Sequence, residues 1–320
     1  MVLDYNNGFK PNQINEYKIA KYFKKQIFLR NEKLKINPFG KSIVKGDIED
    51  DNVWEESAFN VAQRVAYIIN TQFHSIGENQ IVVLREIIEQ GIEKYGNEYS
   101  LDLLGKDLES ATDKSIIQLR GKISPLIKNN PFKSSQDDYD WNKVFEGEND
   151  IEFVNTYQMA NVVPTVQKLI IEFCLRDLWL YVNNNGIDER HPKVLFLDEI
   201  QNLDLSDNST LNQYMHEGRK FGLNIIAATQ DFSGIGGRNT SIASSLMQAS
   251  VKLFFQPSGM ELKSIAQIMR DIDPNKRSVD EWSLALSTLK QGECFLVSET
   301  EAKNGPIKIK IPSMEERGLV

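Results

Sequence analysis

Val194-Leu195-Phe196-Leu197-Asp198-Glu199 decides the fold, because four consecutive apolar residues lead directly into two adjacent carboxylates. Such a run is typical of a buried strand in a parallel sheet, whose carboxyl end lies at the edge where these sheets bind ligands. A helix is expected over residues 211–221, and a second apolar strand over 223–228 leads into Thr229 and Gln230. Strand, helix and strand in this order predict an α/β fold, a parallel sheet with helices on both faces.

The neighbouring segments are expected to extend this core. Met1-Val2-Leu3 has the character of the end of a buried strand, and a long amphipathic helix is expected over residues 165–182. Beyond Gln230, helix and strand continue to alternate, with expected helices at 241–249 and 259–269 and strands at 251–255 and 294–297. We therefore expect residues 1–54 and 151–320 to form one core.

Residues 55–130 have a different periodicity. Apolar side chains recur there every three or four residues, as in Val61, Val65 and Ile69, which is the spacing of amphipathic helices. Four such helices are expected, and together they predict a helical subdomain inserted into the core. The polar, turn-rich residues 131–150 are expected to form a linker.

Composition narrows the possible classes of protein. The chain has 320 residues, 41% of them hydrophobic and 26% charged, which excludes a disordered, collagen-like or coiled-coil protein. The formal net charge of −8 argues against a protein that coats DNA or an anionic membrane with its whole surface. Any contact with nucleic acid is therefore expected to be local.

Cysteine usage and hydropathy indicate a cytoplasmic protein. Cys174 and Cys294 lie far apart, which excludes a CxxC metal site, and both fall on apolar faces where burial is expected. His74, His191 and His216 share no spacing with cysteines or acids. No apolar run is long enough for a membrane span, and the first residues do not resemble a signal peptide.

The acids after the first apolar strand match the Walker B pattern of P-loop ATPases. In that pattern Asp198 holds Mg²⁺ directly or through water, and Glu199 polarises the water that attacks the γ-phosphate of ATP. Gln230, at the tip of the next strand, is a candidate sensor of the γ-phosphate, and Thr229 is a candidate nucleotide contact. The alternative is an ordinary strand followed by an acidic helix start.

Residues 194–202 followed by 217–230 resemble the HerA and FtsK branch of additional-strand P-loop ATPases. Asn37-Pro38-Phe39 resembles a loop found after an early strand in HerA-like and conjugative-secretion ATPases. Within the branch, residues 1–9 and 198–202 are most similar to the DptH family of phosphorothioation-dependent restriction. The resemblance extends over most of the chain and implies a RecA-like fold.

The resemblance also implies cofactors, partners and further site residues. It implies ATP and Mg²⁺, double-stranded DNA that is translocated or unwound, a homo-hexamer or similar ring, and other restriction or defence subunits. Arg219 or Lys220 would be the basic residue that reaches the γ-phosphate of a neighbouring subunit; the alternative is a solvated helix end capped by Gly222. Arg238 would contact DNA, or would belong to a surface loop.

One expected motif is absent from the 320 residues. The Walker A loop, GxxxxGK[ST], does not occur. Gly40-Lys41-Ser42 is not a substitute, because Lys35 stands where the first glycine is required and Asn37-Pro38 replaces the glycine-rich turn. In the family, the Walker A strand and helix come just before the strand at the start of this chain. The chain thus resembles a fragment that begins after them, and nucleotide binding by it alone is in doubt.

Two other functions therefore remain open from the sequence. One is a non-hydrolysing ATPase fold that serves as an assembly or DNA-docking module. The other is a conjugation- or secretion-coupling ATPase. Retention of both Walker B acids together with Thr229 and Gln230 favours hydrolysis over a purely structural role.

Overall fold

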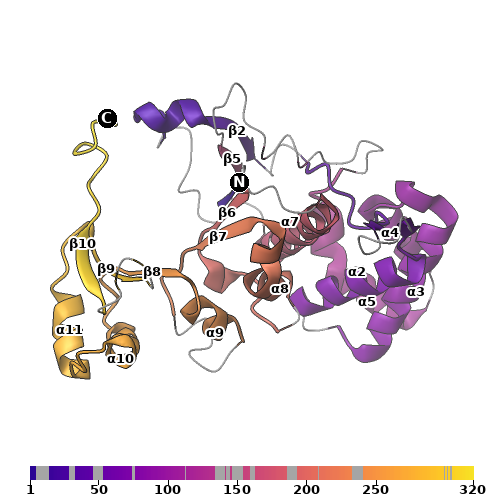
Figure 1. Cartoon of the computed structure of the whole chain (residues 1–320). Coiled ribbons are helices and arrows are strands. Elements are labelled where there is room, and N and C mark those ends of the chain that lie inside the picture. Colours follow the sequence, from indigo (N-terminus) through magenta and orange to yellow (C-terminus); the bar gives the residue numbers. More distant parts are fainter. Residues whose placement is uncertain are drawn as a thin grey trace.

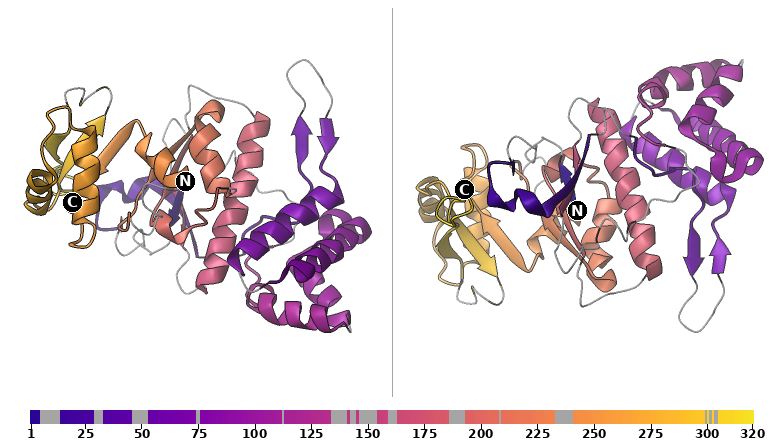
Figure 2. Two further views of the ribbon diagram at one scale, coloured as in Figure 1. Left: turned by 90° about the horizontal axis from the view of Figure 1, so that it is seen from below. Right: turned by 90° about the horizontal axis from the view of Figure 1, so that it is seen from above.

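The computed structural model describes residues 1–4, 14–28, 33–45, 53–73, 76–111, 113–133, 141, 145, 154–158, 163–185, 193–207, 209–232, 241–298, 300, 302 and 305–320 (Figure 1). A central sheet lies between a group of helices and a C-terminal lobe, as the views from above and below also show (Figure 2). Within these ranges, no helix combines the length and the apolar character that a membrane span requires.

The central sheet confirms the predicted parallel architecture. Its five strands are all parallel and lie in the order β2 (Phe23–Phe28), β5 (Val154–Gln158), β1 (Val2–Asp4), β6 (Lys193–Leu197) and β7 (Leu223–Ala227). The predicted strand at the start of the chain is β1, which lies at the centre of the sheet with Leu3 fully buried. The strand that carries the two acids is β6, between β1 and β7.

One face of the sheet is covered by two helices, α7 (Pro164–Asn185) and α8 (Thr210–Glu217). Leu195 and Leu197 of β6 are completely buried on this face. Trp179 of α7 packs edge-to-face on Tyr214 of α8, with ring centroids 5.0 Å apart. Because side chains alternate between the two faces of a strand, Leu195 and Leu197 face this core while Val194 points to the opposite face.

The opposite face of β6 and β7 is more open. Val194 is 39% exposed and Ile226 is 53% exposed. The two strands are thus apolar on both faces, whereas the described helices α7 and α8 cover one of them.

The four helices expected between residues 55 and 130 are present. They are α2 (Ala58–Gln72), α3 (Glu78–Tyr95), α4 (Leu101–Ser110) and α5 (Lys114–Lys128), with the short 3-10 turn η2 (Gly96–Glu98) between α3 and α4. Ser57, Ser100 and Asp113 cap three of them by accepting backbone hydrogen bonds. Assignment of these helices to a separate subdomain stays a prediction.

An antiparallel hairpin precedes the helices and projects from them (Figure 2). It consists of β3 (Ile43–Lys45) and β4 (Val53–Glu55). Residues 34–36 do not form a strand, because Leu34 makes only an isolated bridge with Phe132. The segment is held instead by packing, since Leu34, Ile36 and Phe39 are all buried.

The C-terminal strands differ from expectation, because they do not continue the parallel sheet. They form a separate antiparallel sheet in the order β10 (Ile307–Lys310), β9 (Glu293–Ser298) and β8 (Val251–Phe254). The helices of this part of the chain are α9 (Ser241–Met247), α10 (Leu262–Ile272) and α11 (Val279–Ser287).

The C-terminal lobe has a hydrophobic core of its own, which explains its separate sheet. Trp282 of α11 is completely buried and packs edge-to-face on Phe295 of β9 at 5.1 Å. Met269 of α10 joins the same core. Phe232, in the segment that follows β7, packs against both this core and the main one.

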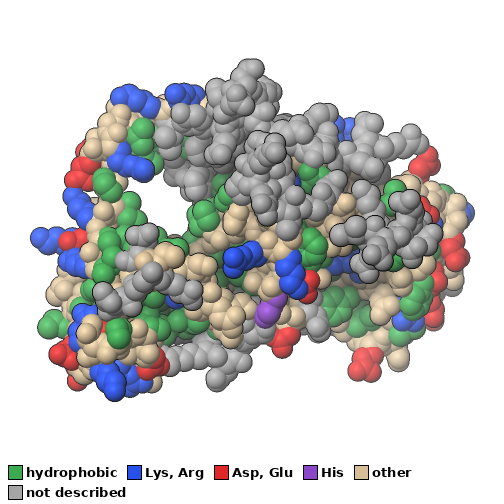
Figure 3. All heavy atoms as spheres, in the orientation of Figure 1, with side chains coloured by type: hydrophobic (Ala, Val, Ile, Leu, Met, Phe, Trp, Pro, Cys, Tyr) green, Lys and Arg blue, Asp and Glu red, His purple; other side chains and the backbone are tan. Residues whose placement is uncertain are grey.

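The last residues of the chain return toward its beginning. They leave β10 and reach the 3-10 helix η1 (Lys18–Tyr22), where Lys18 N donates to the carbonyl of Leu319 at 2.7 Å. The Lys18 ammonium also donates to the carbonyl of Gly318 at 2.8 Å. A hollow separates this terminal segment from the central sheet (Figure 3).

Both cysteines are buried, as predicted. Cys174 lies in α7 and Cys294 in β9. Burial raises the pKa of each thiol above its ordinary value. Neither side chain is therefore an activated nucleophile.

Candidate active site

The two predicted groups of polar residues meet at the carboxyl edge of the sheet. Leu197 and Ala227 are paired in register, and Ala228 N donates to the Leu197 carbonyl at 2.9 Å. Beyond the strands, Ile200 N donates to the Ala228 carbonyl at 3.0 Å. The segment after β6 is therefore attached to the segment after β7, which brings Glu199 close to Gln230.

Glu199 occupies a constrained position at this edge. Its backbone is left-handed, with φ 52° and ψ 50°, and its side chain is almost wholly buried. A non-glycine residue pays roughly 1–2 kcal/mol for this backbone conformation. Two amides offset that cost: Gln230 Nε2 donates to Glu199 Oε1, and Gln201 Nε2 donates to Glu199 Oε2.

Gln201 is a site residue that the sequence analysis missed. It lies in the 3-10 turn η3 (Ile200–Asn202), directly after the two acids. While its amide donates to Glu199, its Oε1 accepts a hydrogen bond from Thr229 Oγ1 at 2.6 Å. Gln201 therefore links Thr229 to Glu199, and its place two residues after a candidate catalytic acid was the available signal.

Asp198 lies at the tip of β6, where its Oδ1 accepts a hydrogen bond from the Glu199 backbone N–H at 3.0 Å. Carboxylate oxygens are suitable ligands for Mg²⁺, which usually keeps several waters and binds one or two carboxylates together with phosphate oxygens. Across the described ranges, no three His, Cys, Asp or Glu side chains converge on one point. The residues therefore fit an ion held jointly by Asp198, a nucleotide and water.

Arg219 and Lys220 lie at the opposite edge of the sheet. Both are exposed in the 3-10 turn η4 (Gly218–Phe221), which ends at Gly222 before the amino end of β7. Gln230 follows the carboxyl end of the same strand. Five residues at ~3.3 Å each separate the two groups by about 17 Å, so one subunit does not bring its own basic residues to Glu199.

The structure does not place the remaining residues singled out in the sequence at this edge. Arg238, His74 and His191 lie outside the described residues. Lys41, in the Gly40-Lys41-Ser42 triplet, forms an ion pair with Glu55 at 3.1 Å. The triplet leads into strand β3, whereas a phosphate-binding loop leads into a helix; it is not a Walker A loop.

Glu172 is a buried acid that holds the amino end of α8. Its Oε1 accepts a hydrogen bond from the backbone N–H of Thr210 at 2.8 Å, at the amino end of α8. Burial raises the pKa of the Glu172 carboxyl to about 7. The sequence signal was an acid on the apolar face of the helix at 165–182, and it was overlooked.

Comparisons with known proteins support the fold. No family model and no curated protein matches the chain. Among solved structures, VirB4 of Thermoanaerobacter pseudethanolicus is 16% identical, with a TM-score of 0.67, and the match covers 98% of this chain and 81% of VirB4.

The bacterial conjugative coupling protein TrwB also matches, in more than one structure. Its unbound form is 13% identical with a TM-score of 0.54, over 97% of this chain and 83% of TrwB. Its complex with ADP and Mg²⁺ is 12% identical with a TM-score of 0.57, over 90% of this chain and 74% of TrwB. The chain therefore has the RecA-like α/β fold of these P-loop ATPases.

Proposed function

We propose that this chain is the core of an ATP-driven motor of the conjugation- or secretion-coupling type. The observation that carries the proposal is the pairing of Glu199 with Gln230 at the carboxyl edge of a RecA-like sheet. The fold likeness to VirB4 and TrwB supports it, and one TrwB structure holds ADP and Mg²⁺ at 12% identity.

In this proposal the acids divide the work of phosphoryl transfer. Asp198 holds Mg²⁺, which neutralises charge on the phosphates when it is bound. Glu199 accepts a proton from the attacking water. Each oxygen of Glu199 accepts one amide hydrogen bond, and the second lone pair of each oxygen can still accept a hydrogen bond from the attacking water. Movement of Gln230 toward the γ-phosphate would free a further acceptor site on Oε1.

Arg219 or Lys220 would act on a neighbouring subunit. Their position at the other edge of the sheet is unsuitable for the nucleotide of their own chain and suits a contact between subunits. A homo-hexamer or a similar ring would place them beside the next active site. In P-loop ATPases and GTPases, an arginine that stabilises the charge of the transition state raises kcat by about 10³–10⁵-fold.

We prefer this function to a role in DNA restriction. The matched structures are a VirB4 protein and a conjugative coupling protein, and neither is described as a restriction component. We still propose that the motor moves double-stranded DNA. The DptH-like assignment and its defence subunits have no support from these comparisons.

Steady-state ATP hydrolysis by the full encoded protein, with and without duplex DNA, tests the proposal. We expect Glu199→Gln to retain ATP binding and to lower turnover by roughly 10²–10⁴-fold, the usual contribution of a general base. Glu86→Gln is the matched control, because it removes the same charge from an exposed position on α3. Unchanged turnover in Glu199→Gln contradicts the assignment, and no turnover in the wild type favours the non-hydrolysing module.

A further inference from the structure

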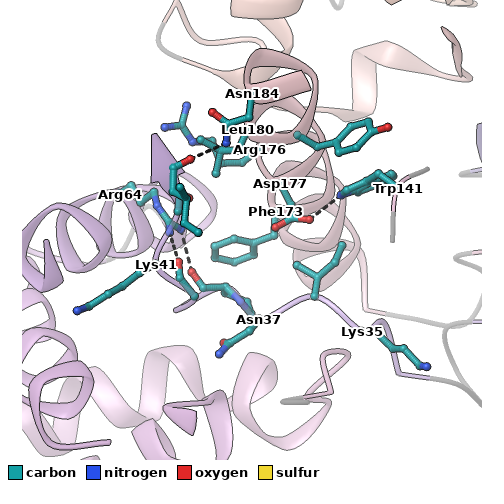
Figure 4. A pocket seen from close by; sticks show the side chains of 16 residues that line it. Lys35, Asn37, Lys41, Arg64, Trp141, Phe173, Arg176, Asp177, Leu180 and Asn184 are labelled. Atoms are coloured by element: carbon teal, nitrogen blue, oxygen red, sulfur yellow. Dashed lines mark hydrogen bonds between the residues drawn. The ribbon is translucent and has the colours of Figure 1, made fainter. Parts of the chain in front are cut away.

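A cavity lies away from the candidate active site, where the loop over residues 35–43 meets α2 and α7 (Figure 4). Its volume is 320 Å³, near the lower end of the range of about 300–1,000 Å³ that small-molecule pockets occupy. Its lining includes neither Asp198 nor Glu199. The cavity is therefore a separate feature with chemistry of its own.

The lining of the cavity is positively charged, although the whole chain is acidic. The basic side chains in the lining are Lys35, Lys41, Arg64 and Arg176. Asp177 is the one acid among the described lining residues, and its Oδ2 accepts a hydrogen bond from Trp141 Nε1 at 2.7 Å. Figure 4 shows Trp141 on the side of the cavity away from Arg64.

Two of these cations are already neutralised. Arg64 forms a partly buried ion pair with Glu56 at 3.0 Å, and it also donates to the carbonyls of Pro38 and Gly40. Lys41 is paired with Glu55. Within the described part of the chain, neither Lys35 nor Arg176 forms an ion pair, so these two side chains supply the excess positive charge.

Arg176 is incompletely hydrogen-bonded. Its Nη1 donates to Gln213 Oε1 at 3.5 Å, the outer limit of a hydrogen bond, and its buried Nε has no acceptor among the described residues. Desolvation and the nearby charge of Arg64 lower the pKa of Arg176. A buried donor without an acceptor is destabilising, and the planar guanidinium is well suited to phosphate and carboxylate oxygens.

We propose that this cavity binds a phosphate-type oxyanion, with Arg176 as its principal ligand and Lys35 at the rim. The oxyanion is free phosphate or the phosphate group of a small phosphomonoester. The apolar walls formed by Phe173 and Trp141 would contact the organic part of such an ester. Because Arg64 of α2 and Arg176 of α7 both line the site, an occupant would bridge these two helices.

Isothermal titration of the full-length protein with inorganic phosphate, and separately with ribose 5-phosphate, tests the proposal at low ionic strength. We expect saturable binding that Arg176→Gln weakens at least tenfold. Arg270→Gln is the matched control, because Arg270 is exposed on α10 and outside the cavity.

Each outcome has a definite meaning. Tighter binding of ribose 5-phosphate identifies a phosphomonoester, and equal binding identifies the free ion. Because Arg176→Gln removes a partly buried side chain, Lys35→Gln serves as a second, exposed variant and should weaken binding severalfold in a chain that is still folded. Absence of saturable binding by the wild type, or equal binding by the folded variants, overturns the proposal.

Discussion

Gln230 donates a side-chain hydrogen bond to Glu199, a residue 31 positions earlier in the chain that follows the neighbouring strand. The two side chains meet because β6 and β7 are parallel and adjacent, so that their carboxyl ends share one edge. A buried carboxylate is stable only when it is hydrogen-bonded. The pair therefore makes the position of the proposed catalytic acid depend on the side chain proposed to sense the nucleotide.

The second amide on Glu199 gives the first prediction. Gln201→Ala removes the donor to Glu199 Oε2 and leaves a buried oxygen without that partner. We expect a loss of roughly 1–3 kcal/mol in the free energy of unfolding, the usual cost of an unsatisfied buried group. Urea denaturation measures it, with Gln248→Ala as control because Gln248 is exposed. Equal stability of the two variants would show that Gln201 does not hold Glu199.

A second prediction concerns pH. The pKa of Glu172 is about 7 in the folded chain against 4.5 for an unperturbed carboxyl, so the folded state binds its proton more tightly. The stability that this proton contributes is complete below pH 4.5 and is lost as pH rises through 7. From linkage, Glu172 contributes about 3 kcal/mol of pH dependence.

Glu172→Gln tests this dependence, because the amide oxygen can still accept the hydrogen bond from Thr210. Unfolding free energies of the wild type and the variant are compared at several values between pH 5 and pH 8. We expect the variant to gain stability relative to the wild type as pH rises. A difference that does not change with pH contradicts a raised pKa at Glu172.

The third prediction concerns packing among the helices. Gly91 of α3 lies against the ring of Tyr99, and an added Cβ would lie 2.1 Å from the nearest ring atom. Gly91→Ala should therefore lower stability by about 1–3 kcal/mol through overpacking. The matched change is Gly121→Ala in α5, where a Cβ meets nothing within 4 Å. That variant should gain about 0.5–1 kcal/mol, because alanine favours a helix interior more than glycine does.

The fourth prediction tests whether the basic turn acts between subunits. Glu199→Gln and Arg219→Ala should each abolish hydrolysis in a pure preparation. Mixed assemblies should recover part of it, because an intact Glu199 in one subunit can meet an intact Arg219 from its neighbour. Lys220→Ala in place of Arg219→Ala identifies which of the two residues acts. Mixtures that stay inactive with both variants would remove this turn from the mechanism.

Residue periodicity predicted the parts of the fold in which local pattern and burial agree. Val61, Val65 and Ile69 recur every four residues and are all completely buried in α2. The run that ends at Leu197 forms a central parallel strand for the same reason. An uninterrupted apolar strand is typical of a parallel sheet, in which both faces of the strand are buried. The meeting of Glu199 and Gln230 followed from strand order.

Other features of the fold and the site depended on tertiary contacts, which the spacing of residues in the sequence does not predict. Val251–Phe254 is a short apolar run, which has the same pattern in a parallel or an antiparallel sheet. Its actual partner, β9, was decided by packing around Trp282. Gln201 was missed because its place two residues after an acid does not by itself predict a contact, and no sequence pattern marks the left-handed backbone of Glu199.

Phe232, which packs against both hydrophobic cores, follows Gln230 by only two residues. A displacement of Gln230 toward a nucleotide phosphate would be transmitted along this short segment as mechanical strain. Its far end is anchored in the packing of the C-terminal lobe, so we expect the lobe to reorient in response. In the proposed motor, the ring of Phe232 would thus couple a chemical event at the sheet edge to movement of the C-terminal lobe.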